Sequence, residues 1–289
     1  MNAFKKQCIE LRKRDYTLPE IARITRRPKS SVYVHIRNLP LSAQKWKLIK
    51  AAHGIRAIQI AARRRGVSAR YYRPFSEWDA DKISLVSHLL FDGEIKRTVC
   101  AYHNRNMSLL KHVESCMDTM YDREPKRWHN KLTGVHRISY FNVSLSAYLK
   151  QKSEELLRDI VSFPTHWQQE FLRSFFDDEG CMDFRAGRNT RRIRGYQKNV
   201  DILRLVQKLL LSFDIFAKIH SPNEIVITGK GNLLRFQKEI GFSRGVRING
   251  RRSNSIWKES LEKREILQRA IASFKPVGSN GVHRNTYTR

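Results

Sequence analysis

Two short segments of this chain repeat one pattern that ends in an acidic residue and a glycine. They are Ile83–Glu94 (ISLVSHLLFDGE) and Glu170–Cys181 (EFLRSFFDDEGC). In each, an apolar run with a central serine precedes the acid, which is Asp92 in the first copy and Glu179 in the second. Carboxylates are natural ligands of hard divalent cations, and such cations can activate water and stabilise the charge that develops when a phosphodiester is cut. One acid from each copy therefore predicts a shared, metal-dependent phosphodiester-cleaving site.

The helices that precede the two acids must bring them together. In the second copy the apolar side chains repeat at helical spacing on two sides of the helix: Trp167, Phe171, Leu172, Phe175 and Phe176. A helix of this kind fits between its own domain and a twin. Ser87 and Ser174 occupy matching positions and are small enough for two backbones to approach closely. We therefore expect the helices to cross near these serines, so that Asp92 and Glu179 meet at their C-terminal ends.

A single acid and glycine at the end of a helix also has an ordinary explanation. Glycine is the usual residue just after the last helical turn. Two copies, each after a similar apolar helix with serine at the same offset, favour a functional role instead. A carboxylate at a helix C-terminus opposes the helix dipole, at roughly 0.3–1 kcal/mol each. A bound cation would relieve that cost.

The composition points to a polyanionic partner. The 289 residues include 56 Lys and Arg against 27 Asp and Glu, for a formal net charge of +29. Such an excess opposes compaction unless a polyanion compensates it, so nucleic acid is the leading partner and a membrane surface the weaker alternative. The four scattered cysteines and the histidines show no metal-ligand spacing. No signal peptide or membrane-spanning run is present, and we expect a cytoplasmic protein, associated with the nucleoid in a prokaryotic or phage setting.

Residues 1–42 predict three short helices with a basic turn. Residues 17–20 (TLPE) have the form of a capping box with proline early in the helix. A basic turn separates this helix from a third at 30–38, a layout that predicts a helix-turn-helix DNA-binding domain whose second element enters the major groove. An ordinary three-helix bundle is the alternative. The candidate contact residues are Lys29, Ser30, Ser31, Tyr33 and Arg37.

Residues 43–75 follow as a basic, partly helical connector. Its positive side chains lie beside tyrosines, which suits phosphate neutralisation with some base stacking. A solvated linker is the alternative. The candidate contact residues are Arg63, Arg64 and Arg65.

From residue 76 one succession of elements occurs twice. The two units, 76–163 and 164–275, both predict the order αββαββα, with Glu94–Tyr102 expected as a single strand. Residues 276–289 are rich in Gly, Ser and Asn and are expected to form a flexible tail. The sequence thus predicts an α+β protein made of two pseudo-symmetric half-domains and a small all-α N-terminal domain.

The paired segments resemble the signature helices of LAGLIDADG homing endonucleases in their monomeric two-repeat form. The resemblance covers about residues 76–240, and the second motif is the closer match. It implies that Asp92 and Glu179 bind Mg²⁺, or another divalent cation such as Mn²⁺, together with the main-chain carbonyls of Phe91 and Asp178. The first motif departs from the family pattern at His88 and Leu90.

The resemblance also implies a saddle of antiparallel strands along the major groove of DNA. In strand 181–186, Met182 and Phe184 should point to the core, and Asp183 and Arg185 to DNA. A solvated basic strand edge is the alternative. The candidate contacts are Lys96, Thr98, Tyr102, Arg105, Lys126, Arg127, Asp183, Arg185, Arg188, Arg191, Arg192, Arg194 and Gln197.

The family usually keeps a basic residue near the scissile phosphates, late in each half. Arg247, in the segment Gly241–Arg247, is the candidate for a catalytic residue of this kind. Lysine is commoner there than arginine.

These features together predict a site-specific, divalent-metal-dependent DNA endonuclease. It would act as a monomer and make double-strand cuts at a long recognition sequence. The chain starts with Met and lacks an adjacent His-Asn pair near its end, so a free-standing or intron-encoded protein is expected rather than an intein. One alternative is a non-cleaving DNA-binding transcriptional regulator. The other is an intron maturase that binds structured RNA, because phosphate contacts dominate both kinds of nucleic-acid binding.

Overall fold

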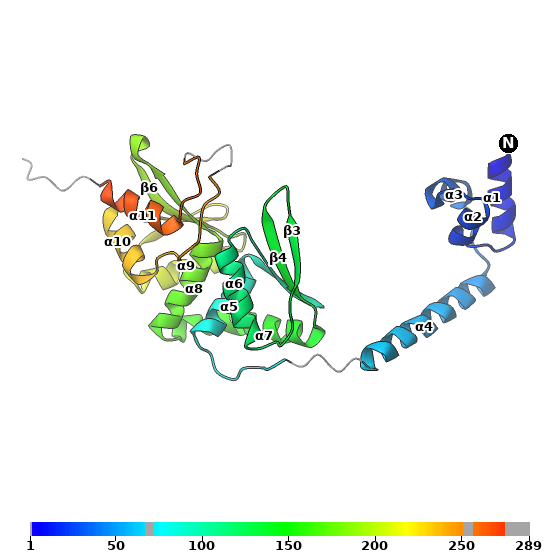
Figure 1. Cartoon of the computed structure of the whole chain (residues 1–289), viewed down its shortest axis with the longest axis horizontal. Helices are drawn as coiled ribbons and strands as arrows, with labels where there is room; N and C mark the ends of the chain where they lie inside the picture. The colour runs from blue at the N-terminus through cyan, green and yellow to red at the C-terminus, as the bar shows by residue number, and fades with distance from the viewer. Residues whose placement is uncertain (1, 67–71, 251–256, 275–289) are drawn as a thin grey trace, which may run out of the picture. The chain divides into compact units, whose positions relative to one another are not determined.

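The computed structural model describes residues 2–66, 72–250 and 257–274. The chain divides into two compact units, Met1–Arg70 and Tyr71–Arg289 (Figure 1). The predicted tail at 276–289 lies outside the described residues, as do the side chains of Arg63, Arg64 and Arg65. Within the described part, no helix combines the length and the apolarity that crossing a membrane requires.

Three short helices and one long helix form the N-terminal unit: α1 (Ala3–Lys13), α2 (Leu18–Ile24), α3 (Lys29–Ile36) and α4 (Ala43–Gly66). The first three helices enclose a small core of Cys8, Ile21, Val32 and Ile36. The predicted capping box is present, and the backbone N–H of Thr17 donates to the carboxylate of Glu20 at 2.6 Å. The helices of this unit therefore form as the sequence predicts.

The first half of the C-terminal unit has the element order αββαββα. Its elements are α5 (Ala80–Phe91), β1 (Gly93–Lys96), β2 (Val99–Asn104), α6 (Met107–Asp118), β3 (Lys126–Asn130), β4 (Val135–Tyr140) and α7 (Val143–Asp159). The segment expected as one strand, Glu94–Tyr102, is instead a hairpin of β1 and β2. Lys96 pairs with Val99 at its end.

The second half repeats this order and adds a C-terminal helix. After the 3₁₀ turn η1 (Ile160–Ser162), its elements are α8 (Thr165–Asp178), β5 (Gly180–Arg185), η2 (Ala186–Arg188), β6 (Thr190–Tyr196), α9 (Val200–Leu211), β7 (Ala217–His220), β8 (Glu224–Thr228), α10 (Lys230–Glu239) and α11 (Lys263–Ala272).

Each half contains a four-stranded antiparallel sheet, and the two sheets have the same strand order. The order is β1-β2-β4-β3 in the first half and β5-β6-β8-β7 in the second. Equivalent strands thus take equivalent places, which confirms the predicted α+β fold with two related halves.

The two signature helices pack directly against each other. Helices α5 and α8 lie side by side in the centre of the C-terminal unit (Figure 1). Phe171, Phe175 and Phe176 of α8 are fully buried, as predicted for a helix enclosed on two sides. The hydroxyls of Ser84 and Ser174 lie 3.5 Å apart across the contact. One hydrophobic core runs through both halves.

The glycines after the two acids are required by close packing. A Cβ at Gly93 would lie 2.5 Å from the carbonyl oxygen of Leu89, and a Cβ at Gly180 would lie 2.4 Å from that of Phe176. Neither glycine has a positive φ, so they do not serve the usual left-handed helix cap. They let the chain turn tightly from each signature helix into its first strand, which fixes where the acids sit.

Candidate functional site

The two predicted acids occupy equivalent positions at the ends of the central helices. Asp92 caps α5 and Glu179 caps α8, and both are half-buried. Burial raises the pKa of Asp92 to about 8, and the charges of Asp178 and Glu179 act in the same direction. Burial, followed by the charge of Asp178, raises the pKa of Glu179 to about 7. The acids from the two halves therefore interact electrostatically, as the crossing of the helices predicts.

A hydrogen-bond network holds Asp92 in place. The side-chain amide of Asn104, at the end of β2, donates to Asp92 Oδ2 at 2.9 Å. It also lies 3.3 Å from Asp178 Oδ1, which accepts the hydroxyl of Tyr102 at 2.5 Å. On its other oxygen, Asp178 bonds to Nδ1 of His88 at 2.8 Å. One hydrogen-bonded cluster thus connects four residues of the first half, His88, Asp92, Tyr102 and Asn104, with Asp178 of the second half.

The side chain of Asp178 is fully buried, so this network provides the partners that a buried carboxylate requires. Burial, and then the charge of Asp178, raises the pKa of the Tyr102 hydroxyl well above its usual value. Tyr102 was predicted to contact DNA. Instead it is fully buried in this cluster, because the even-numbered residues of β2 face the helices.

A buried lysine stands at the end of α8. Lys263, the first residue of α11, donates to the carbonyl oxygens of Phe176 at 3.1 Å and Asp177 at 2.6 Å. These carbonyls belong to the last turn of the helix, where intrahelical partners are missing and the dipole favours a cation. Burial lowers the pKa of Lys263, while Asp177 and Asp178 oppose this shift.

The sequence analysis did not single out Lys263. The sequence does contain a sign of its burial. Lys263 shares one face of helix α11 with Ile266, Leu267 and Ala270, which are apolar and buried. A lysine on the core side of a helix requires a buried partner.

Arg247, the predicted basic residue, lies in the same region and is half-exposed. Its guanidinium donates to the carbonyl of Ser260 at 3.0 Å and lies 3.5 Å from Glu262. Its backbone N–H donates to Asn106 Oδ1 in the first half at 2.8 Å. The side chain thus supports the segment that leads to Lys263.

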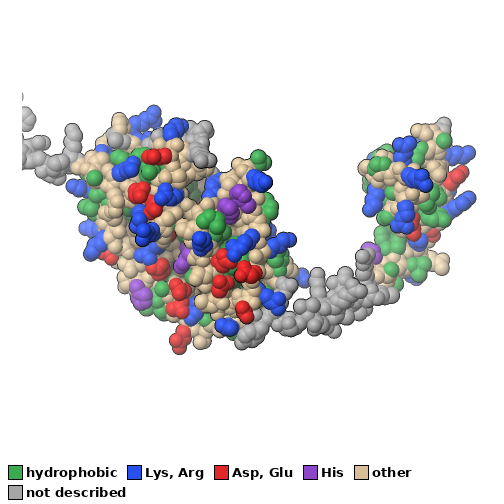
Figure 2. All heavy atoms as spheres, in the orientation of Figure 1, with side chains coloured by type: hydrophobic (Ala, Val, Ile, Leu, Met, Phe, Trp, Pro, Cys, Tyr) green, Lys and Arg blue, Asp and Glu red, His purple; other side chains and the backbone are tan. Residues whose placement is uncertain are grey.

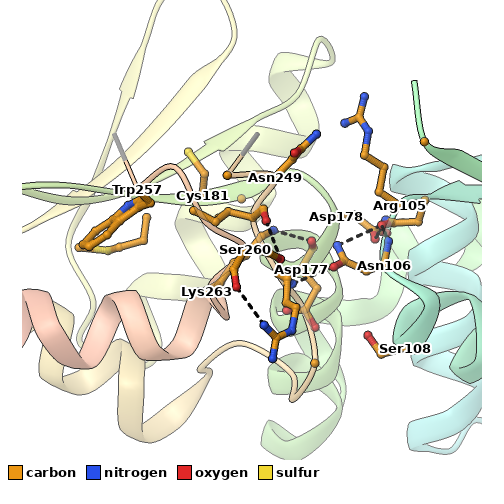
Figure 3. Close-up of a pocket in the computed structure, with 18 of the residues that line it drawn as sticks. Arg105, Asn106, Ser108, Asp177, Asp178, Cys181, Asn249, Trp257, Ser260 and Lys263 are labelled. Atoms are coloured by element: carbon orange, nitrogen blue, oxygen red, sulfur yellow. Dashed lines mark hydrogen bonds between the residues drawn. The ribbon is translucent and has the colours of Figure 1, made fainter. Parts of the chain in front are cut away.

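Side chains of both halves line a hollow of about 1490 Å³ next to Asp92. Its lining includes Asp92, Asp178, Arg247 and Lys263. Figure 3 shows Asn106, Asp178 and Lys263 drawn around this space. In the described part of the chain, no three His, Cys, Asp or Glu side chains gather as a ready metal-binding group. The acidic residues that interact near the ends of α5 and α8 are Asp92, Asp178 and Glu179.

The sheet of the second half separates its polar and apolar side chains as predicted. Met182 and Phe184 of β5 are buried, whereas Asp183 and Arg185 lie on the opposite face. Arg192 is paired with Asp183 in register and therefore shares that face. Arg194 lies on it too, two positions along β6. We call this the outer face of the second sheet.

Arg191 differs from the prediction, because it lies on the inner face. It is paired with Phe184 in register and donates to the hydroxyl of Ser273 at 2.7 Å, just after α11. Its guanidinium also stacks over the Phe274 ring at 4.9 Å. Arg191 therefore fastens the C-terminal helix to the sheet.

The outer face of the first sheet carries Lys96, Lys126 and Arg137. The sequence analysis missed Arg137, although Ile138 and Tyr140 of β4 are buried and the alternation of that strand places Arg137 outward. Arg127 was predicted to contact DNA. It is paired in register with the buried Ile138, and its guanidinium contacts Glu114 of α6 on the helix side.

The remaining predicted contact residues are less engaged within the fold. Thr98 and Arg188 are exposed, Arg105 donates to the carbonyl of Thr133, and the Gln197 side chain accepts from Asn199. In the N-terminal unit the candidate residues are all exposed: Lys29, Ser30, Ser31, Tyr33 and Arg37.

Comparison with known families agrees with this geometry. Residues 166–241 match the model of the LAGLIDADG-like domain. The match begins in α8 and ends after α10, so it contains Glu179 and the four strands of the second sheet. The first half repeats the element order and the strand order of the matched segment.

The chain is also similar to short parts of two much longer curated proteins, both named "Probable translation initiation factor IF-2". The protein from Pyrococcus horikoshii is 32% identical over 102 residues, which cover 35% of this chain and 9% of the relative. The protein from Thermococcus kodakarensis is 29% identical over 127 residues, which cover 43% and 10%. This chain thus spans about a tenth of the length of either relative.

Two solved structures are similar to part of this chain. I-DmoI in complex with DNA and Mn is 17% identical, with a TM-score of 0.43 over 57% of this chain and 99% of that one. Full-length WhiA from Thermatoga maritima is 17% identical, with a TM-score of 0.48 over 72% and 64%. Likeness at this level carries no inference about activity.

Proposed function

We propose that this protein is a divalent-metal-dependent DNA endonuclease. The observation that carries the proposal is the pair of half-buried acids, Asp92 and Glu179, contributed by two related halves. Burial raises the pKa of both acids, and Asp92 lines a hollow that also contains Arg247 and Lys263. Two carboxylates held together in this way favour the binding of protons or cations, since either relieves the repulsion between them.

The donor set suits a hard divalent cation such as Mg²⁺ or Mn²⁺. Asp92 and Glu179 would hold it, with the main-chain oxygens of Phe91 and Asp178 as the further predicted ligands. When bound, the cation would supply an activated water and would stabilise the charge of the pentavalent phosphate. Asn104 fixes the rotamer of Asp92 through its 2.9 Å hydrogen bond. Lys263 holds the last turn of α8 and adds a positive charge beside both acids.

The outer faces of the two sheets would bind the duplex. Their lysines and arginines neutralise phosphates, and arginine can also contact guanine through two hydrogen bonds. For residues 1–42 of the N-terminal unit we propose a helix-turn-helix role in which α3 enters the major groove. Ser30, Tyr33 and Arg37 fit this role because they are exposed and spaced along α3 at helical intervals.

A non-cleaving DNA-binding regulator is the second candidate. The presence of both acids, with Asp92 oriented by Asn104, favours cleavage. An RNA-binding maturase remains the third candidate, with structured RNA in place of the duplex.

The test is cleavage of a large random-insert DNA library with Mg²⁺, by the unaltered protein and by Glu179→Gln and Asp92→Asn. We expect cuts at one recurrent long sequence, a loss of at least about a thousandfold in either variant, and binding within a few fold of normal. Tight duplex binding without cuts would favour the regulator. Preference for structured RNA would favour the maturase, and equal loss of binding and cutting in the variants would contradict the catalytic assignment.

A further inference from the structure

Three acidic residues lie among the basic side chains on the outer faces of the sheets. They are Glu94 on β1, Asp183 on β5 and Glu224 on β8. Acidic side chains also occur among basic ones on the visible surface of the C-terminal unit (Figure 2). A carboxylate on a surface that faces phosphates weakens binding through repulsion. The presence of three of them on the proposed DNA-binding faces therefore needs a reason.

The geometry around Asp183 gives the clearest indication. Its side chain is only 10% exposed, whereas those of Arg185 and Arg192 are 43% and 41% exposed. Asp183 Oδ2 accepts from Arg192 Nε at 2.9 Å and lies 2.9 Å from its Nη2. Asp183 Oδ1 accepts from Arg185 Nε at 3.2 Å. The nearly buried carboxylate of Asp183 thus accepts hydrogen bonds from the Nε atoms of two arginines.

Glu224 holds Arg194 in a similar way on the neighbouring strand. Its carboxylate bonds to Arg194 Nε, and the guanidinium stacks over the Tyr196 ring at 4.9 Å. This hydrogen bond with Arg194 is the main reason that the pKa of Glu224 is lowered, so the carboxylate stays charged.

The first half repeats the arrangement with Glu94. Arg137 Nη2 lies 3.3 Å from one oxygen of Glu94, and Lys96 Nζ lies 2.9 Å from the other. Arg137 Nε also donates to the hydroxyl of Ser139 at 2.8 Å. Both sheets therefore carry arginines whose side chains are fixed by a neighbouring acid.

Fold stability is a weak reason for these ion pairs. Exposed pairs on a surface usually contribute little, because solvent screens them and two long side chains lose freedom. An arginine held in one orientation has a specific use, since its planar fork can donate two parallel hydrogen bonds to guanine O6 and N7. An arginine without such support binds any phosphate nearby, whatever the sequence.

We propose that Asp183, Glu224 and Glu94 determine sequence specificity by orienting Arg192, Arg194 and Arg137 toward guanines and by repelling mismatched DNA. The inference rests on the proposed DNA-binding function. Each acid lowers the affinity for unrelated DNA and increases the difference between the preferred sequence and all others. The target should then contain guanines where these arginines reach the major groove.

The experiment is selection of bound duplexes from a randomised pool without divalent metal, followed by affinity measurements on the selected duplex and a scrambled one. Asp183→Asn should raise affinity for the scrambled duplex a few fold. It should also lower the preference for the selected duplex by about tenfold, with the loss confined to one or two guanine positions. Asp201→Asn is the matched control, because it makes the same charge change beside Arg204 on α9, where the pair is largely exposed.

Arg192→Lys gives a second test, because it keeps the positive charge but removes the guanidinium that can donate two parallel hydrogen bonds. It should lose the same guanine preference and leave affinity for the scrambled duplex unchanged. Thermal melting of each variant checks that the fold is intact. An unchanged preference in Asp183→Asn, or an equal change in Asp201→Asn, would overturn the inference while leaving DNA binding in place. If the unaltered protein prefers no duplex at all, both the inference and the proposed function fail.

Discussion

One contact between the two signature helices is polar, and the contact at the equivalent positions of the repeat is aromatic. His88 of α5 bonds to Asp178 of α8 at 2.8 Å. The positions equivalent by the repeat are Phe175 and Phe91, whose rings meet edge to face with centroids 5.2 Å apart. Of two equivalent contacts between α5 and α8, one is therefore a buried polar pair and the other a pair of aromatic rings.

The strands beside these contacts also differ, with a polar aromatic residue in the first half and a glycine in the second. Tyr102 of β2 pairs with Gly93, and Gly195 of β6 pairs with Gly180. A Cβ at Gly195 would lie 2.7 Å from the Phe175 ring, so glycine makes room for the aromatic pair. In the first half Asn104 thus donates to the acid, Asp92, whereas the second half packs hydrocarbon at the equivalent place and Lys263 holds the end of α8. The halves share a fold but are not interchangeable.

Removing Lys263 should have the largest effect on stability. Lys263→Met leaves the carbonyls of Phe176 and Asp177 without their donor and the buried acids without a counter-charge. We expect the free energy of unfolding to fall by about 3 kcal/mol, measured by urea denaturation. Lys208→Met, on the exposed side of α9, is the control and should change it by less than about 0.5 kcal/mol. Equal losses would show that Lys263 has no special role.

Converting the polar pair into the aromatic one tests the comparison directly. His88→Phe alone should cost about 2 kcal/mol, because Asp178 keeps only part of its hydrogen bonding in a buried place. Asp178→Phe alone should cost a similar amount. The double variant reproduces the contact of Phe91 and Phe175, so we expect its loss to be at least about 1 kcal/mol less than the sum. Strictly additive losses would mean that the two side chains do not form a unit.

The sequence was sufficient for the features that depend on local pattern. The repeat located Asp92 and Glu179, helical periodicity predicted the two-sided burial of α8, and alternation oriented Asp183. These signals lie within one element. The order of the elements followed from the same periodicities, with the hairpin at β1 and β2 as the exception.

What the sequence could not supply depends on contacts between distant segments. Lys263 meets carbonyls 86 and 87 residues earlier, and Arg191 meets Ser273 82 residues later. Tyr102 was assigned to the wrong face because the hairpin of β1 and β2 was not recognised. Arg127 was assigned wrongly because it follows Lys126 directly on β3, so the two side chains point to opposite faces. A one-residue error in the phase of a strand turns every side chain to the other face.

Asn104 and Gln197 allow a smaller test at another equivalent pair. Each side-chain oxygen accepts the backbone N–H two residues later, of Asn106 and Asn199. Only Asn104 also donates to a signature acid in the described structure. Asn104→Ala should slow single-turnover cleavage at saturating protein by about tenfold, the usual cost of losing a residue that orients a metal ligand. Gln197→Ala should stay within about twofold, and a larger effect there would remove the asymmetry.

The raised pKa values of the two acids predict a pH effect on the metal-free protein. A carboxyl group whose pKa is raised by folding stabilises the protein fully below its unfolded value, near pH 4. That stability is lost as the pH rises through the folded value, about 8 for Asp92 and about 7 for Glu179. Asp178 raises the pKa of His88 despite burial, and this shift acts in the same direction. The melting temperature in chelator should therefore fall between pH 5 and pH 8.5.

Asp92→Asn distinguishes the contribution of Asp92 to this pH dependence from that of His88. It removes one titrating carboxyl and keeps a neighbour of similar shape for Asn104, so the fall in melting temperature should become shallower by about 2–4 °C, or about 1 kcal/mol. Adding Mg²⁺ at pH 8 should raise the melting temperature of the unaltered protein more than that of the variant. If both show the same slope and the same response to Mg²⁺, burial does not raise the pKa of Asp92 in the folded protein. The two halves would then differ in packing alone.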